Sequence, residues 1–233
     1  MKHFHSISCF ACLGLMLFFG CKKDHTAEQP ALGYNYFPLI VGKALIYQID
    51  SIGFKGYTYD PTTQTVEIDS VHYQIKEVVD GFFTDNAGRQ TATISRYKRQ
   101  NANDPWLIYK VFAANLTTTT AERLEDNIRY IKLVFPARNN TKWNGNSYNN
   151  GEPLLYELFD VNTQSAIGSL DFDLTLTVLQ NYDSNLLYFK NYFEKYASGT
   201  GMIYKEYNDY DFMFIGSTKP KNGFIYKETL ISL

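Results

Sequence analysis

Cysteine and histidine are scarce in this chain, and the few present gather near its start. All three cysteines fall within the first 21 residues, and only one of the four histidines, His72, comes after residue 25. Zinc sites are built mainly from cysteine and histidine, and a disulfide needs two cysteines. No Gly-x-Ser-x-Gly turn and no phosphate loop ending in Gly-Lys-Ser/Thr occurs. We therefore predict no catalytic residue, no metal site and no cofactor.

Long hydrophobic runs are also missing, apart from one at the N-terminus. Residues 7–19 are apolar and follow a short basic start, which fits a signal peptide, because a spanning helix needs about 20 apolar residues. The run ends in Gly20-Cys21, which looks like a bacterial lipobox. We predict a signal peptide at 1–20, lipidation of Cys21 and a flexible tether at 21–33, with membrane attachment through the lipid. The alternative is an ordinary signal peptide with an incidental cysteine.

Charge of one sign is not concentrated anywhere. The net charge is −2 and no basic stripe is present, so we predict no nucleic-acid partner. Aromatic residues, in contrast, are abundant, with 19 Tyr and 17 Phe, which is typical of strands and of binding surfaces alike. Lys22, directly after Cys21, favours sorting to an outer membrane, on its periplasmic side or at the cell surface.

Alternation of apolar and polar residues indicates strands along residues 34–233. The clearest alternation is at 171–180, and Gly201–Glu206 is nearly repeated at Gly223–Glu228, which predicts two neighbouring antiparallel strands. The fold class is mainly β: a single antiparallel domain, either a curved sheet or partial barrel or a sandwich, with room for one short covering helix. Residues 121–126 fit one helical turn, and 185–196 fit a helix or, as we favour, a strand.

Turn signals divide these strands. Asp80-Gly81 and Asn222-Gly223 predict tight turns, and the Asn- and Gly-rich segment at 139–151 predicts a loop around Trp143.

Three blocks carry a resemblance. Tyr36-Phe37-Pro38-Leu39 with Gly42, the pair Leu133–Pro136 and Trp143–Asn146, and Glu194–Glu206 together resemble small Bacteroidota lipoproteins of the outer membrane or cell surface. The resemblance implies that location and a β-rich fold, and it implies no activity.

Candidate site residues are few. Trp143 with Asn144 and Asn146 fits a sugar platform, although Trp143 also fits a loop anchor, which we favour. Ser51 and Ser70 lie in Asp-Ser-apolar triplets that resemble Bacteroidota O-glycosylation sites. Carboxylates that a glycosidase would need are present as Asp171 and Asp173, Asp209 and Asp211, and Glu194 and Glu206.

Three functions remain open from the sequence. The first is a non-catalytic envelope lipoprotein that binds another protein or a glycan. The second is a carrier of a lipid or another apolar ligand in the hollow of a curved sheet. The third is a carboxylate-based hydrolase. The lack of catalytic motifs favours the first.

Overall fold

A computed structural model describes residues 32–233 of the chain. The predicted signal peptide and the lipidation site Cys21 lie outside the described residues. The described part contains one short 3-10 turn, η1, twelve β-strands and no α-helix. Their bounds are η1 Tyr34–Tyr36, β1 Ala44–Asp60, β2 Thr65–Thr84, β3 Gln90–Arg99, β4 Leu107–Leu116, β5 Thr120–Glu125, β6 Ile128–Val134, β7 Lys142–Asn144, β8 Leu155–Ile167, β9 Leu170–Ser184, β10 Tyr188–Ala197, β11 Gly201–Phe212 and β12 Pro220–Ser232.

The twelve strands form one antiparallel sheet that is nearly closed and barrel-like. Their order is β6-β5-β4-β3-β2-β1-β12-β11-β10-β9-β8-β7, so the first and last strands pair at the centre and each half meanders outward. The predicted antiparallel β fold is confirmed. The predicted neighbours are also confirmed, because Lys205 pairs with Glu228, and Glu206 with Lys227, across β11 and β12.

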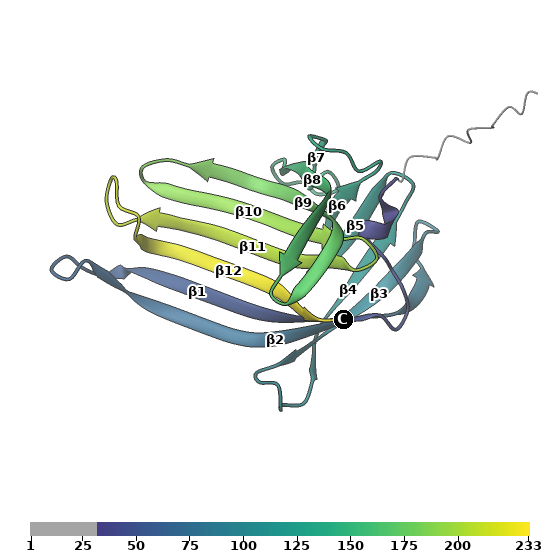
Figure 1. Cartoon of the computed structure of the whole chain (residues 1–233), viewed down its shortest axis with the longest axis horizontal. Coiled ribbons are helices and arrows are strands. Elements are labelled where there is room, and N and C mark those ends of the chain that lie inside the picture. The colour runs from purple at the N-terminus through teal and green to yellow at the C-terminus, as the bar shows by residue number, and fades with distance from the viewer. Residues whose placement is uncertain (1–31) are drawn as a thin grey trace, which may run out of the picture. The chain divides into compact units, whose positions relative to one another are not determined.

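The two ends of the sheet, β6 and β7, meet through a few hydrogen bonds. The Ile131 amide donates to the Gly145 carbonyl at 2.9 Å, and the Trp143 indole donates to the Ile131 carbonyl, also at 2.9 Å. The Asn149 side chain adds a bond to the Arg129 carbonyl at 2.8 Å. In Figure 1 the strands β1, β12, β11 and β10 extend side by side well beyond the region where β3 to β6 cross.

An apolar core fills one end of the sheet interior. It is built from inward positions of most strands, because alternate residues of a strand share a face. Its most deeply buried members include Tyr36, Tyr47, Ile49, Ile75, Leu133, Leu158, Leu176, Tyr196, Ile203 and Leu230. The η1 segment belongs to this core: Tyr36 is 2 % exposed and its hydroxyl donates to Asn162 at 2.8 Å.

Several local predictions need correction. Residues 121–126 form strand β5 and its turn, because Ala121 and Arg123 both point into the interior, where a helical turn would expose one of them. The 139–151 loop contains the short strand β7. Asp80-Gly81 does not turn the chain, since β2 runs through it with a bulge between Val79 and Gly81. For residues 185–196 the favoured strand is confirmed as β10.

Asn222-Gly223 is likewise not a turn but part of β12. Gly223 has φ of 119° and sits between Phe54 and Tyr210 in the sheet register. A Cβ at this position would lie 2.1 Å from the Asp209 carbonyl oxygen. Glycine is therefore needed here because the backbones of β11 and β12 approach closely, and an Asn-Gly pair in the sequence does not distinguish this from a turn.

Candidate functional site

Eight charged side chains lie on the inner face of the sheet, next to the apolar core. None has a side chain more than 22 % exposed, and the four carboxylates balance the four cations. The eight residues, named here the charge ring, are Glu77, Arg96, Arg123, Glu125, Lys132, Glu194, Lys205 and Glu228. Glu77 illustrates why these charged side chains point inward: it lies on the same face of β2 as the buried Ile75 and Val79, because alternate residues of a strand share a face.

Ion pairs of alternating sign connect the whole set. The order is Glu228–Arg96–Glu77–Arg123–Glu125–Lys132–Glu194–Lys205. The Lys132 ammonium lies 2.6 Å from Glu194 Oε1 and 3.8 Å from Glu125 Oε1. The two ends, Lys205 and Glu228, are register partners on β11 and β12, so the series runs around the interior and its ends lie on neighbouring strands.

The ion pairs keep these buried groups ionised. Burial alone opposes the charged form of Glu77, Glu125 and Glu194, but attraction to the neighbouring cations outweighs it and lowers the pKa of each carboxyl. Burial likewise opposes the charged form of Lys132 and Lys205, and the attraction of Glu194 outweighs it and raises both pKa values.

Tyrosine hydroxyls complete the bonding of the ring carboxylates. The Tyr196 hydroxyl donates to Glu194 Oε2 at 2.6 Å, and the Tyr226 hydroxyl donates to Glu228 Oε2 at 3.0 Å. Both tyrosines stand two residues from their carboxylate on the same strand, and therefore on the same face.

A pocket of about 270 Å³ opens beside the charge ring. Its walls include four tyrosines, Tyr130, Tyr156, Tyr192 and Tyr207, and three ring members, Glu125, Lys132 and Lys205, contribute to the lining. We call it the tyrosine pocket. Tyr192 and Tyr207 are register partners on β10 and β11, and their rings stack at 4.7 Å between centroids.

Several polar groups of the tyrosine pocket make no hydrogen bond within residues 32–233. Gln180 is 6 % exposed, and its buried Nε2 makes no hydrogen bond, whereas its Oε1 accepts from the Tyr207 hydroxyl at 2.7 Å. The Lys205 ammonium is 3.6 Å from Glu194 Oε1, beyond ordinary hydrogen-bond length. The Tyr156 hydroxyl makes no hydrogen bond to another described residue, and burial raises its pKa to about 12. Each of these groups keeps an N–H or O–H that is not used in a hydrogen bond to a described residue.

A smaller hollow lies beside the apolar core. It measures about 50 Å³ and is lined by Phe37, Leu45, Val79 and Met202, with Glu77 and Arg123 from the charge ring. A water molecule occupies about 30 Å³ of liquid, so this hollow has room for only one or two waters.

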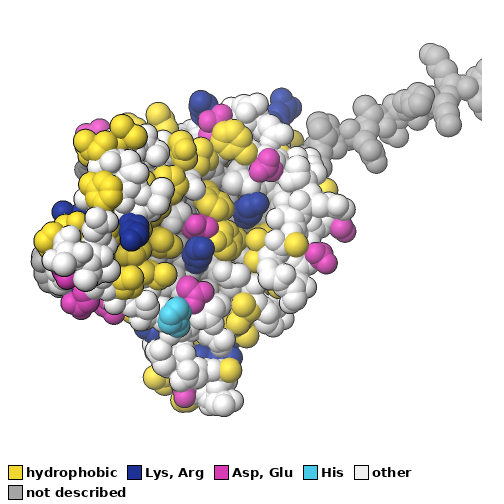
Figure 2. Space-filling model, turned by 60° about the vertical axis from the view of Figure 1, so that its left-hand side comes forward, with side chains coloured by type: hydrophobic (Ala, Val, Ile, Leu, Met, Phe, Trp, Pro, Cys, Tyr) yellow, Lys and Arg dark blue, Asp and Glu magenta, His cyan; other side chains and the backbone are white. Residues whose placement is uncertain are grey.

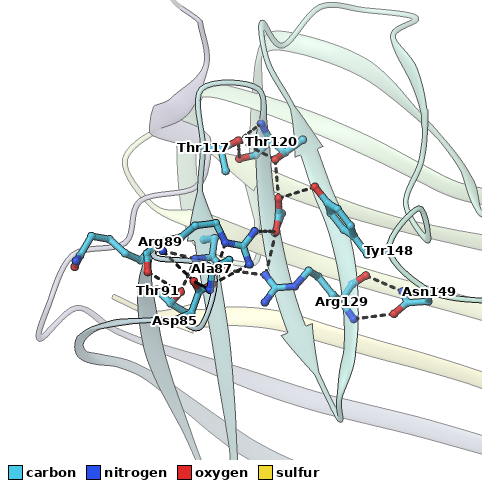
Figure 3. A network of polar contacts seen from close by, with 12 residues as sticks. Asp85, Ala87, Arg89, Thr91, Thr117, Thr120, Arg129, Tyr148 and Asn149 are labelled. Atoms are coloured by element: carbon cyan, nitrogen blue, oxygen red, sulfur yellow. Dashed lines mark hydrogen bonds and ion pairs between the residues drawn. The ribbon is translucent and has the colours of Figure 1, made fainter.

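A further buried carboxylate, that of Glu122, lies on the outer side of β5. Arg89 and Arg129 approach its Oε2 at 3.2 and 3.0 Å, and the Tyr148 hydroxyl and Thr120 reach its Oε1 at 3.0 and 3.1 Å (Figure 3). The network connects the loop after β7 to strands β5 and β6, and we interpret its role as structural.

The outer face of the long strands is rich in aromatic rings. Phe54, Tyr210, Phe189 and Tyr182 follow one another across it with centroids 6.0, 5.5 and 6.3 Å apart. Beside them runs a register row of Glu206, Lys227, Asp50 and His72. Figure 2 shows hydrophobic side chains gathered on one side of the described residues and divided by a file of charged side chains.

The predicted sugar platform lies at the seam of the sheet rather than in the tyrosine pocket. The Trp143 indole N–H donates to the Ile131 carbonyl, and the Trp143 ring packs against the Tyr156 ring at 5.7 Å between centroids. Asn144 Oδ1 accepts hydrogen bonds from the amides of Asn146 and Leu154, both at 2.9 Å. Asn146 donates to the Glu152 carbonyl at 3.0 Å. These side chains hold the segment after β7 in place.

The other predicted residues are dispersed. Ser51 lies on the inner side of β1 opposite Tyr226, and Ser70 is exposed on β2. O-glycosylation of either stays a prediction. Among the carboxylate pairs, Glu194 faces inward and Glu206 outward, because Glu194 pairs with Lys205 and Glu206 with Phe193. They therefore do not form a pair, and Asp171 and Asp173 are exposed on β9.

The sequence pattern missed most of the pocket. Gln180 and Tyr207 carried no motif, and Glu194 was named only as half of a carboxylate pair. Within residues 32–233 no helix has the length and apolar character to cross a bilayer. No group of three His, Cys, Asp or Glu in that range is placed to hold a metal ion.

Comparison with protein-family models and with curated protein sequences found no match for the chain. The tyrosine pocket and the charge ring are therefore the features that bear on function.

Proposed function

We propose that the protein is a lipid-anchored binding protein of the bacterial envelope that holds a small polar ligand in the tyrosine pocket without transforming it. The observation that carries the proposal is the lining of one 270 Å³ space by Gln180, Lys205 and Tyr156, whose Nε2, ammonium and hydroxyl groups make no hydrogen bond to a described residue. Buried polar groups left without partners are costly, and a ligand that bonds to them recovers that cost.

The lining favours binding over hydrolysis. A glycosidase needs two carboxyl groups, one of them with a raised pKa so that it acts as an acid. Glu125 is the only carboxylate in the lining, and its neighbouring cations lower its pKa. The hollow beside the apolar core, about 50 Å³, is too small for an acyl chain, so this hollow gives the lipid-carrier alternative no support.

Calorimetric titration of the purified protein with neutral and acidic monosaccharides and with amino acids tests the binding proposal. The variant Gln180→Leu should weaken binding of the ligand found by about tenfold, because it removes the free donor. Gln164→Leu is the matched control, since Gln164 is exposed on β8. A Gln180→Leu protein that binds like the control would show that the ligand does not enter the tyrosine pocket.

The anchor is tested separately. Cells that express the chain should incorporate labelled palmitate into it, and Cys21→Ala should abolish the label and release the protein from membranes. Labelling that persists in Cys21→Ala would remove the anchor from the proposal but leave the binding function standing.

A further inference from the structure

We infer that the ligand of the tyrosine pocket is an acidic sugar whose carboxylate binds Lys205 and Gln180. The inference deepens the proposed binding function and rests on it. Its basis is an excess of donors: two ammonium groups and a free amide face the pocket, against one carboxylate.

The cations of the lining are not equally committed. The Lys132 ammonium is held 2.6 Å from Glu194, in a direct ion pair. The Lys205 ammonium, which shares the same Glu194 oxygen, lies 3.6 Å from it and makes no hydrogen bond to a described residue. Glu125 offers an anionic ligand little repulsion, because it already faces Arg123 at 3.2 Å and Lys132 at 3.8 Å.

A carboxylate placed at Lys205 would therefore gain charge-assisted hydrogen bonds, which are roughly twice as strong as neutral ones. Gln180 Nε2 supplies a second donor, and Gln180 Oε1 accepts from the Tyr207 hydroxyl at 2.7 Å. An ammonium and a neighbouring amide donor suit the two oxygens of one carboxylate.

The rest of the pocket suits a sugar ring. Its 270 Å³ equals the liquid volume of about nine waters, the scale of a monosaccharide. The hydroxyls of Tyr130 and Tyr156 and the amide of Asn181 face this space and make no hydrogen bond to another described residue, so they are available to sugar hydroxyls. The stacked rings of Tyr192 and Tyr207 provide an apolar wall.

The test compares galacturonate and glucuronate with galactose and glucose by calorimetric titration of the purified protein, with 4-hydroxybenzoate as a non-sugar acid. We expect at least one uronate to bind roughly tenfold or more tightly than its neutral parent, with affinity that falls as salt rises. Lys205→Met should remove most of this preference. Lys195→Met is the matched control, because Lys195 points to the opposite face of the sheet from Glu194.

A second variant guards against misfolding of Lys205→Met. Gln180→Glu keeps the side-chain size and places a negative charge in the pocket, so it should weaken uronate binding by roughly tenfold or more and change galactose binding little. Equal affinity for uronate and neutral sugar would overturn the acidic-sugar inference and leave the binding function intact. Preference for 4-hydroxybenzoate over both uronates would overturn the sugar class, and binding of none of these probes would overturn the inference as a whole. The proposed function itself would fall only if the wider panel also failed.

Discussion

Replacing Glu194 by glutamine should destabilise the protein strongly, although the two side chains have nearly the same shape. Glu194 is fully buried and accepts hydrogen bonds from Lys132 at 2.6 Å and from Tyr196 at 2.6 Å, with Lys205 at 3.6 Å. Glu194→Gln removes one of four carboxylates that balance four cations, so a buried positive charge is left uncompensated. Loss of one partner of a buried ion pair costs about 3–5 kcal/mol.

Urea unfolding followed by intrinsic fluorescence measures this loss directly. A domain of this size should also lose about 10 °C in Tm, because each kcal/mol shifts Tm by roughly 2–4 °C. The control is Glu152→Gln at an exposed position, which should stay within about 0.5 kcal/mol of the parent. A Glu194→Gln protein as stable as this control would refute the claim that the ring is held together by charge.

A double variant separates the charge from the packing. Glu194→Leu with Lys132→Met removes both partners of the 2.6 Å pair and fills the site with apolar atoms of similar size. Apolar replacement of a whole buried pair is often neutral, so the double variant should be more stable than the sum of its single variants predicts. Strictly additive losses would indicate that the two side chains act independently.

Four further predictions follow from individual contacts of the described residues. Stability should fall in acid, because folding lowers the pKa of Glu194 below its ordinary value of 4.5. The contribution of Glu194 to stability is complete above the pKa of the unfolded state and is lost as pH falls through the pKa of the folded state. A urea midpoint that stays flat from pH 7 to pH 3 would contradict this. Spectrophotometric titration should show Tyr156 ionising near pH 12, since burial raises its pKa, and Tyr156→Phe should remove that step. Gly145→Ala should destabilise the protein by about 1–3 kcal/mol in thermal unfolding, because the added Cβ would lie 2.3 Å from the Tyr156 ring. The control is Gly88→Ala, which has open space around the added Cβ but a positive φ, so it measures the cost of backbone strain alone. Trp143→Phe should cost about 1 kcal/mol and speed hydrogen exchange of the Ile131 amide, because the indole bond to Ile131 helps to close the seam.

The strands were predictable because their signal is local. Alternation marked most of them, and the repeat of Gly201–Glu206 at Gly223–Glu228 correctly predicted neighbours. Turn signals were less reliable, because glycine serves both a turn and a close approach between strands, as at Gly223. The segment at 121–126 was ambiguous for a related reason: Glu122 and Arg123 are both buried, each in a different polar network, so no clean alternation remains.

The tyrosine pocket was not predictable, because its parts come from strands that are distant in sequence. Lys132 and Glu194 are 62 residues apart and meet only when the sheet curves. A charged residue in an alternating strand is normally assigned to the solvent face, so the pattern alone places these side chains on the wrong side. The sequence signal that could have indicated the charge ring is a charged residue at an alternate position between two apolar ones, such as Glu77 between Ile75 and Val79.

The charge ring is difficult to explain as a device for stability alone. Burying eight charges costs desolvation free energy that ion pairing roughly offsets, and a core of apolar side chains would stabilise the sheet at least as well. What the ring provides is a cation at the pocket that makes no hydrogen bond to a described residue, with Glu194 Oε1 at 3.6 Å and the Tyr207 ring centroid at 4.6 Å as its neighbours. Glu194 keeps Lys205 charged from 3.6 Å, while Lys132 takes the 2.6 Å contact on the same oxygen. An isolated lysine in this interior would lose its proton to avoid the cost of burial. The balanced ring thus allows an ammonium to stay buried, ionised and available to an anionic ligand, which links the least expected feature of the core to the proposed binding function.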